Sequence, residues 1–348
     1  MDASVIVVNW HQPDLTARCI RSLADQDVEG TVEIVLVENE AAPGAAERWA
    51  REFPDLVVVE RADNAGFAGG VDAGVRVSRG DVLVLLNNDA VAEPGFLEGG
   101  LSRLRGEGED VAVVTAAVEL EGTFEPASGP GADVLTGLDG SWWRRSTSSR
   151  AVRLVNGTGV DVDRSGNGHD RDWLRPVEDE RGGGRSASEE PFGFSGGAAF
   201  IRRDALAEVG GFDASLFMYY EDLDVSWRLR LGGLRIVHDP RARAVHRHAA
   251  SSGSGSSLVR YQSMRNRLAV VARNGSASLL ARVVVRTLVR FLRDLARPAA
   301  AQLSGRDWAR LARETPVLVR SALRARRGDG ASGRDRRRVE ALFGGHRR

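Results

Sequence analysis

The stretch Val82-Leu-Val-Leu-Leu-Asn-Asn-Asp89 joins five apolar residues directly to two amides and a carboxylate. A continuous apolar run of this kind predicts a strand buried on both faces of a sheet, as in parallel sheets that helices cover. In such sheets ligands bind beyond the carboxyl ends of the strands, where Asn87, Asn88 and Asp89 would lie. The stretch therefore predicts an α/β fold and also the rim on which a site would be built.

The residues before this stretch alternate apolar runs with amphipathic helical patterns. Strands are predicted at Val5–Val8, Glu33–Val37 and Leu56–Val59, and helices beginning near Leu15, Ala45 and Gly70. Continuous β-branched runs separated by helices are typical of a parallel sheet with both faces covered. The first two strands lead into Asn9 and Glu38, so we expect these side chains on the same rim as Asp89.

Composition and charge divide the chain further. We predict a main domain over residues 1–250 with a flexible loop at about 176–190, a helical extension over 258–327 and a disordered tail over 328–348. The net charge is zero, yet residues 1–257 hold 26 Arg against 42 Asp and Glu, whereas residues 258–348 hold 22 Arg against 6. The single cysteine, Cys19, fits a reducing compartment. We expect no signal peptide, since the start has no basic region, and no membrane span, since no apolar run reaches about 18–20 residues.

The extension carries a basic amphipathic helix at 277–297. Its arginines follow one another at spacings of 4, 4, 3 and 4 residues, which aligns them on one face opposite an apolar one: Arg282, Arg286, Arg290, Arg293 and Arg297. Such a helix lies on an anionic membrane surface or packs on the domain with a solvated face, and both alternatives remain open. No base-reading module accompanies the arginines, so we expect no nucleic acid partner.

The segment Phe217–Arg228 concentrates charge beside aromatic rings. Glu221, Asp222 and Asp224 fall within four residues, after the run Phe-Met-Tyr-Tyr. Crowding carboxylates there raises their energy unless a metal, a cation or a proton is shared, so the segment predicts a site. Upstream, the Gly-rich turn from Asn64 to Asp72 would let a ligand approach the backbone at a helix start.

These pieces together resemble the family-2 inverting glycosyltransferases with the GT-A (nucleotide-diphospho-sugar transferase) fold, especially the bacterial rhamnosyltransferase-like and galactofuranosyltransferase-like group. The resemblance covers roughly residues 3–250. Its motifs, which are specific as an ordered set, are Ser4–Asn9, Val37–Asn39, Asn64–Asp72, Leu85–Asp89, Ser195–Ala198, Gly210–Asp213, Tyr220–Arg228 and Pro240–His248.

The resemblance implies a role for each matching residue. Asp222 would be the catalytic base, with Glu221 and Asp224 holding it or binding acceptor hydroxyls. Asp89 would bind Mg²⁺ or Mn²⁺ as the last residue of a D-x-D-like motif whose first position is here Asn87, and His246 would be a second ligand, with His248 as its competitor. Arg228 either faces the diphosphate or forms a salt bridge. The residues implied in donor binding are Asn9, Glu38, Asn64, Gly66, Phe67, Asn87, Asn88, Gly196, Gly197 and Arg228.

The expected activity is metal-dependent inverting transfer from a nucleoside diphosphate sugar to a hydroxyl of a cell-envelope glycan or a polyprenyl-linked saccharide. The resemblance favours dTDP-rhamnose as donor, and a UDP-hexose or UDP-galactofuranose second. The enzyme is expected in the cytoplasm, peripheral on the inner face of the cell membrane. Two alternatives remain: a catalytically inactive glycan-binding or assembly subunit, and a nucleotidyltransferase. The latter normally needs a Gly-rich basic loop after the first strand, which Asn9–Leu15 lacks.

Overall fold

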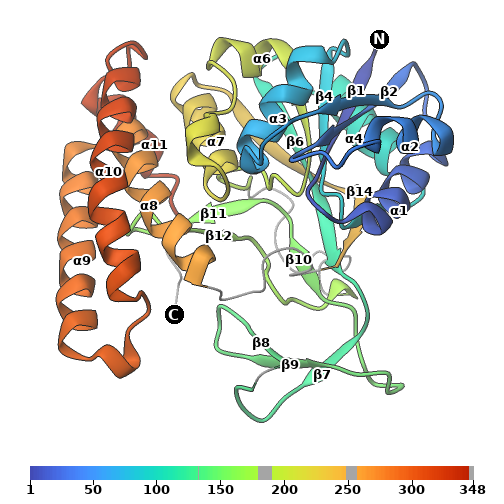
Figure 1. Cartoon of the computed structure of the whole chain (residues 1–348). Coiled ribbons are helices and arrows are strands. Elements are labelled where there is room, and N and C mark those ends of the chain that lie inside the picture. Colours follow the sequence, from blue (N-terminus) through green and yellow to red (C-terminus); the bar gives the residue numbers. More distant parts are fainter. Residues whose placement is uncertain (132, 179–189, 248–256, 345–348) are drawn as a thin grey trace.

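The computed structural model describes residues 1–131, 133–178, 190–247 and 257–344 (Figure 1). The strands of its main sheet are β1 (Ala3–Asn9), β2 (Val32–Glu38), β3 (Val57–Glu60), β4 (Val82–Leu86), β5 (Ala90–Ala92), β6 (Val111–Leu120), β10 (Val155–Gly157), β13 (Ala198–Arg202) and β14 (Arg235–His246). They are ordered β3-β2-β1-β4-β13-β6-β14-β5, with β10 paired to β6.

The sheet is mixed in direction. Strands β1 to β4 run parallel, as the sequence predicts, and β14 runs parallel to β6. Strand β13 runs antiparallel to both β4 and β6, and β5 runs antiparallel to β14. The α/β architecture with a C-terminal helical extension is confirmed, but β13 makes the sheet less parallel than the strand–helix alternation suggests.

Helices cover both faces of the sheet because successive strand residues point in opposite directions. In β1, Val5 and Val7 enter the core with α1 and α4, whereas Ile6 enters the core with α3, α6 and α7. The helices are α1 (Pro13–Ala24), α2 (Ala45–Glu52), α3 (Gly66–Val77), α4 (Phe96–Gly106), α6 (Arg203–Glu208) and α7 (Glu221–Leu231), with a 3-10 turn, η1 (Ala214–Leu216), before α7.

Two small sheets occupy the region where the sequence pattern changes. One has the order β7-β9-β8 and lies below the main sheet in Figure 1; the other is the hairpin β11–β12. Their strands are β7 (Phe124–Pro126), β8 (Val134–Thr136), β9 (Trp142–Arg145), β11 (Val160–Val162) and β12 (Gly168–Asp170). The loop predicted at 176–190 lies largely outside the described residues.

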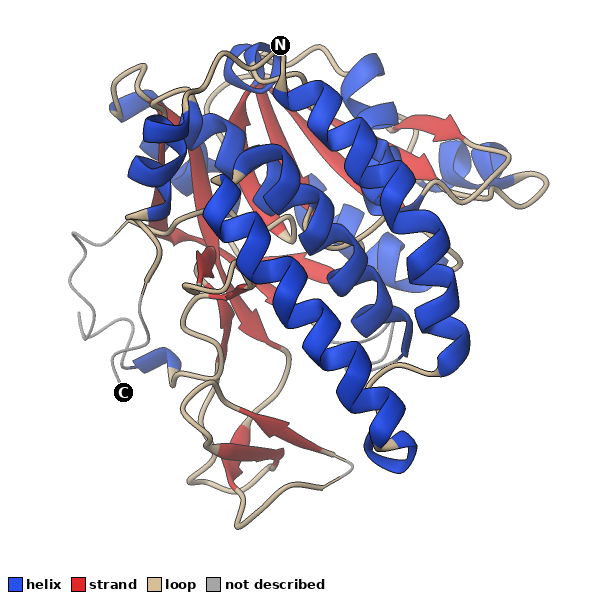
Figure 2. Ribbon diagram, turned by 90° about the vertical axis from the view of Figure 1, so that its left-hand side faces the viewer, coloured by secondary structure: helices blue, strands red, loops and turns tan. Residues whose placement is uncertain are grey.

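The extension forms a helical layer that packs on the main domain through α7. Figure 2 shows its long helices in front of the sheet. Trp227 of α7 is completely buried in a core shared with this layer, and the Phe343 ring meets it edge-on at 5.2 Å. The elements of the layer are α8 (Ser257–Asn274), α9 (Ala277–Ala296), η2 (Pro298–Ala300), α10 (Gly305–Arg326) and α11 (Gly333–Glu340).

Helix α11 corrects the expectation of a disordered tail from residue 328. Ser332 and Asp335 form a capping box at its start, and Val339 is buried. The Arg336 guanidinium pairs with Asp329 at 2.7 Å and donates to the backbone oxygen of Asn274. The Arg-rich composition hides this helix because the pairing of the single buried Arg336 and a few apolar contacts fix it.

One edge of helix α9 packs into the core that it shares with α8, and a second apolar face of the helix is exposed to solvent. Leu279 and Val283 are buried, whereas five other apolar side chains are 56–66% exposed: Val285, Leu288, Val289, Leu292 and Leu295. We call these five residues the α9 outer face. No helix among the described residues combines the length and apolarity needed to cross a bilayer.

Candidate active site

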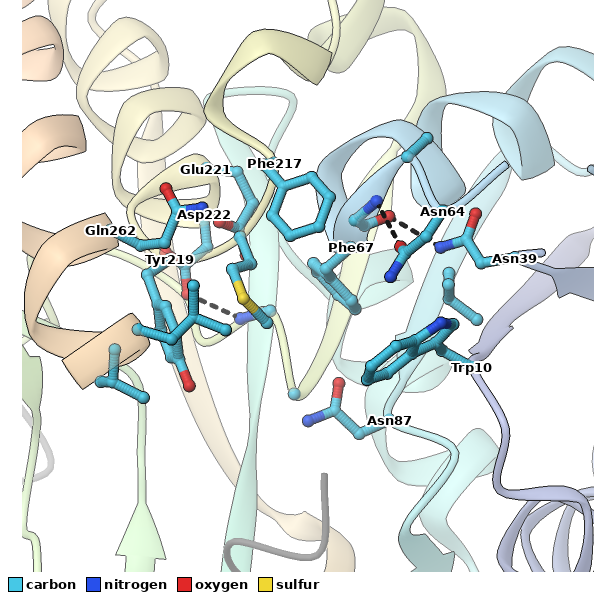
Figure 3. A pocket seen from close by; sticks show the side chains of 18 of the residues that line it. Trp10, Asn39, Asn64, Phe67, Asn87, Phe217, Tyr219, Glu221, Asp222 and Gln262 are labelled. Atoms are coloured by element: carbon cyan, nitrogen blue, oxygen red, sulfur yellow. Dashed lines mark hydrogen bonds between the residues drawn. The ribbon is translucent and has the colours of Figure 1, made fainter. Parts of the chain in front are cut away.

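A cavity of about 980 Å³ opens beyond the carboxyl ends of β1 and β4, between α3, α7 and α8 (Figure 3). Its volume lies near the upper end of the range for small-molecule sites, which suits a ligand as large as a nucleotide sugar. Four α8 residues and two α10 residues complete its wall, and no sequence pattern predicts their place there: Leu258, Val259, Gln262, Arg265, Arg310 and Glu314.

Asp89 and His246, the two metal ligands that the resemblance implies, meet at this cavity. Strand β14 pairs with β5 so that His246 lies opposite Ala90, which brings the imidazole beside Asp89. Nε2 of His246 lies 2.9 Å from Oδ1 of Asp89, and Nδ1 donates to Oδ1 of Asn156 at 2.9 Å. Because Oδ1 of Asn156 only accepts, Nδ1 carries a hydrogen and Nε2 faces the Asp89 carboxylate, where either a proton or a metal cation can join the two atoms.

The donor set fits a hard divalent cation. It combines a carboxylate with an imidazole oriented by a second residue, which is how metal-binding histidines are usually held. No group of three or more His, Cys, Asp and Glu suited to a metal occurs in the described part of the chain. Mg²⁺ in nucleotide sites is commonly held by one or two protein ligands plus phosphate oxygens and water, so two ligands suffice there. His248 lies outside the described residues.

Glu221 and Asp222 line the same cavity from the first turn of α7. The Asp222 carboxylate accepts hydrogen bonds from the backbone N–H of Gly196 (3.0 Å) and of Leu223 (2.7 Å). Burial nevertheless raises the pKa of Asp222. Burial also raises the pKa of Glu221 well above its usual range, and the Asp222 charge adds to the rise. Among the described residues Oε2 of Glu221 has no hydrogen-bond partner, so Asp222 is the better stabilised anion of the pair.

Asp170 is a further carboxyl group at the cavity, which sequence reasoning missed. It ends β12 and lines the wall near Asp222 and His246. Burial raises the pKa of Asp170 to about 7; the Asp222 charge adds to the rise and His246 opposes it. Its position in a Gly-, Ser- and Arg-rich region offers no sequence signal, because only the β11–β12 hairpin brings it to the site.

Most of the residues predicted to bind the donor line the cavity. Those lining it are Asn64, Gly66, Phe67, Asn87, Asn88, Gly196 and Gly197. The structure adds Trp10, whose indole is 43% exposed, and Asn39, whose amide donates to the backbone oxygen of Gly66 at 2.9 Å. Figure 3 shows Trp10, Asn39 and Asn64 on one side of the cavity. Trp10 directly follows Asn9, a predicted rim residue, and this position was the signal from which its place at the cavity could have been predicted.

Asn9 and Glu38 do not line the cavity. They face each other across the β1–β2 ladder, and the Asn9 amide donates to both Glu38 oxygens at 2.9 and 3.0 Å. Trp49 also donates to Glu38, and Asn88 donates to Asn9 at 3.2 Å. Both side chains are thus committed to a buried network behind the wall, which corrects their predicted contact with the donor.

Asp224 and Arg228 also lie away from the cavity. Arg228 pairs with Asp224 at 2.7 Å, one helical turn apart, and donates to the backbone oxygen of Gly211 at 2.7 Å. Arg273 and Asn274 of α8 reach the same carboxylate at 3.1 and 2.8 Å. This buried cluster fixes α7 to α8. The salt-bridge alternative for Arg228 is therefore the observed one, and Asp224 contacts neither Asp222 nor the cavity wall in the described hydrogen bonds.

Comparisons with known proteins give the family of the sequence and the relatives of the fold. Residues 4–210 match the sequence profile described as Glycosyl transferase family 2. The N-acetylglucosaminyl-diphospho-decaprenol L-rhamnosyltransferase of Mycobacterium tuberculosis is 24% identical over 265 residues, which cover 72% of this chain and 77% of that protein.

Two solved structures resemble the fold. A mannosyltransferase from Pyrobaculum calidifontis in complex with GDP-Man and Mn²⁺ superposes with a TM-score of 0.52 and 16% identity, covering 94% of this chain and 87% of that chain. GalNAc-T7 with UDP, GalNAc and Mn²⁺ superposes with a TM-score of 0.55 and 14% identity over 78% of this chain. That match spans only 48% of the GalNAc-T7 chain. The likeness establishes a GT-A fold.

Proposed function

The chain belongs to glycosyl transferase family 2 and is a glycosyltransferase, and from this premise we propose an inverting, metal-dependent transfer from a nucleoside diphosphate sugar to a hydroxyl of a cell-envelope glycan or lipid-linked saccharide. The observation that carries the proposal is one cavity that holds the Glu221–Asp222 pair together with the Asp89–His246 pair. An inverting transfer needs little more than a base for the acceptor and a site for the leaving diphosphate.

Asp222 acts as the base. The acceptor oxygen attacks the anomeric carbon as its proton passes to the Asp222 carboxylate, and the bond from that carbon to the diphosphate oxygen breaks with its electron pair on the diphosphate. A raised pKa makes the carboxylate a stronger base, while the two backbone N–H donors keep it ionised and fixed in direction. Burial and the Asp222 charge raise the pKa of Glu221 and so favour its protonated form, in which the cavity carries one negative charge fewer.

Asp89 and His246 would hold Mg²⁺ or Mn²⁺. When bound, the ion supplies positive charge to the diphosphate oxygens, on which negative charge grows as the sugar leaves. Asn156 holds the imidazole so that Nε2 faces Asp89. Asp89 follows β4 and His246 ends β14. Both strands belong to the central sheet, which supports the pair rigidly.

Trp10, Asn39 and Asn64 form the side of the cavity suited to the nucleoside. Trp10 offers an aromatic surface for a base, and the two amides offer hydrogen bonds to base or ribose. We take dTDP-rhamnose as the first donor to test, because the relative from M. tuberculosis is named a rhamnosyltransferase. A UDP-hexose or UDP-galactofuranose comes second, and the acceptor named for that relative is carried on a polyprenyl diphosphate.

We further propose that the enzyme works in the cytoplasm on the inner face of the cell membrane, with the α9 outer face resting on the lipid surface. Five exposed apolar side chains on one helix face form more than the scattered apolar surface of ordinary monomers. Arg282, Arg286 and Arg293 follow one edge of that face by their helical spacing, which suits anionic lipids. A lipid-linked acceptor would meet the enzyme there.

The experiment is a screen of nucleotide sugars for transfer to polyprenyl-diphosphate-linked saccharides, with Mg²⁺, Mn²⁺ or a chelator. We expect one donor to support transfer only when a divalent ion is present. NMR of the product should show the anomeric configuration opposite to that of the sugar in the donor. Asp222→Asn should lower kcat by about 10²–10⁴-fold with nucleotide binding retained. Asp110→Asn, which alters an exposed carboxylate ion-paired with Arg235 and not among the cavity-lining residues, is the matched control. The proposal would be overturned if the wild-type protein bound glycan but neither transferred a sugar nor hydrolysed any donor.

A further inference from the structure

The residues before Glu221 adopt a strained backbone. Three of the four non-glycine residues at 217–220 have positive φ: Phe217 (66°), Tyr219 (66°) and Tyr220 (73°). Phe217, with ψ of −68°, is the centre of a γ-turn closed by a 2.8 Å hydrogen bond from the N–H of Met218 to the oxygen of Leu216. Side chains disfavour these conformations, which persist only where surrounding structure holds them and which cluster at functional sites.

One side chain of the extension holds this turn. Asn266 of α8 is completely buried, and its Nδ2 lies 2.7, 2.9 and 2.7 Å from the backbone oxygens of Leu216, Met218 and Tyr219. All three neighbours accept, so the donating end of the amide must face the turn. Its oxygen accepts from Arg265 at 2.8 Å, and Arg265 also donates to the backbone oxygen of Ser215 at 3.0 Å.

The opposite side of the turn contacts the start of α3, which lines the cavity with Gly66 and Phe67. The oxygen of Phe217 accepts from the N–H of Ala68 at 3.0 Å, and a Cβ at Gly66 would lie 2.2 Å from the same oxygen. In the view of Figure 3, the Phe217 ring lies between Glu221 and Asp222 on one side and Phe67 on the other. The turn therefore fixes the position of Glu221 and Asp222 relative to the start of α3. Asn266 of α8 holds the turn in place.

We propose that Asn266 is a positioning residue for the transfer reaction: by holding the backbone of residues 216–220, it sets the direction in which the α7 start presents Asp222 to the acceptor. The inference rests on the proposed function for its catalytic consequence. It makes the extension part of the catalytic machinery, because the amide that orients the base comes from α8. A shift of about 1 Å in a catalytic group can cost 10²-fold in rate.

The test compares full-length Asn266→Ala with Asn274→Ala. Asn274 is an equally buried amide two turns further along α8, and it donates to Asp224 at 2.8 Å without touching the turn. Both variants should lose similar thermal stability. Only Asn266→Ala should lose kcat, by about 10²-fold, while the Kd values of dTDP and UDP with Mn²⁺ stay within about twofold of wild type. Asn266→Ser, which keeps one donor, should fall between Asn266→Ala and the wild type.

A second readout separates this inference from the proposed function. Hydrogen exchange of the peptide covering 216–224 should accelerate in Asn266→Ala and remain unchanged in Asn274→Ala, whether or not a donor is known. Faster exchange with a wild type inactive on every donor would retain the positioning role and reject the function. Equal kcat in the two alanine variants would reject the positioning role alone. Failure of both Asn266 variants to fold, when Asn274→Ala folds, would also reject it, since Asn266 would then serve folding.

Discussion

Replacing two leucines of the α9 outer face should detach the enzyme from lipid without altering its chemistry. Leu288 and Leu292 are 56% and 59% exposed, so more than half of each side chain remains available for burial. Complete burial of a leucine is worth about 1.5–3 kcal/mol, which leaves about 1–1.5 kcal/mol for each residue. The double variant Leu288→Gln/Leu292→Gln should therefore lose about 2–3 kcal/mol, or roughly 30- to 150-fold in the vesicle partition coefficient.

The assay is flotation of full-length protein with vesicles of phosphatidylcholine alone or with phosphatidylglycerol. Arg282→Gln/Arg293→Gln should weaken binding to the anionic vesicles by about 2 kcal/mol and leave binding to neutral ones unchanged. Leu138→Gln is the matched control, since Leu138 is 47% exposed in a loop remote from α9 in sequence. Transfer to a water-soluble acceptor should be equal in all four proteins. Point substitutions are required because removing 258–348 would also remove Asn266 and part of the cavity wall.

If the leucine variant floats as well as wild type, the α9 outer face does not contact lipid, and the membrane proposal loses its structural basis. Loss of flotation together with loss of activity on the soluble acceptor would point instead to a disturbed α8–α9 packing. The prediction thus separates a lipid surface from a structural role.

Four further predictions concern the site. Because burial raises the pKa of Asp222 and the base must be ionised, kcat should fall with decreasing pH at a higher pH than for an ordinary aspartate; a pH–rate profile without that fall would contradict the assignment. The pKa of Glu221 is raised, so the folded state holds its proton to higher pH than the unfolded state and stability is lost as pH rises; Glu221→Gln should then raise the Tm more at pH 8 than at pH 5, and an equal gain at both would refute the sign. Asn156→Ala, by freeing His246, should raise the half-saturating metal concentration about 10–100-fold in activity titrations, and an unchanged value would exclude it as a metal-orienting residue. Gly66→Ala places a Cβ 2.2 Å from a backbone oxygen at a φ of +69°, so it should cost about 1–3 kcal/mol or more in denaturant melts, whereas a stability equal to wild type would show that the turn can move.

The rim of the sheet was predictable because strand ends leave a local signal. Apolar runs that end in polar residues put Asn87, Asn88 and Asp89 at the carboxyl ends, and the structure has them at the cavity. The same reasoning was wrong for Asn9 and Glu38. A strand end says which edge a residue reaches, but the cross-strand partner decides whether its side chain faces the ligand or a neighbour, and here the two residues bind each other.

The wall built by the C-terminal helices was beyond the sequence for a different reason. Helical periodicity identifies a basic amphipathic helix but not the element it packs against, since packing depends on contacts distant in sequence. Asn266 sits in a pattern of alternating arginines with no local feature that separates it from a surface amide. Only the fold brings it within hydrogen-bond distance of a turn nearly 50 residues earlier.

The three carboxylates of α7 illustrate how a fold divides the work of one motif. Helix geometry turns Asp222 and Asp224, two positions apart, about 200° away from each other, so they cannot serve the same space. Their local pattern does not distinguish the one that faces a ligand, because both lie in the first turn; the family resemblance, not the spacing, assigned the base to Asp222. The packing of α7 decides it: the guanidinium groups of Arg228 and of Arg273 from α8 pair with Asp224 in a buried cluster, and the opposite direction leaves Asp222 to the cavity. The helix that orients the catalytic turn therefore also contributes to the cluster that holds Asp224 away from the cavity.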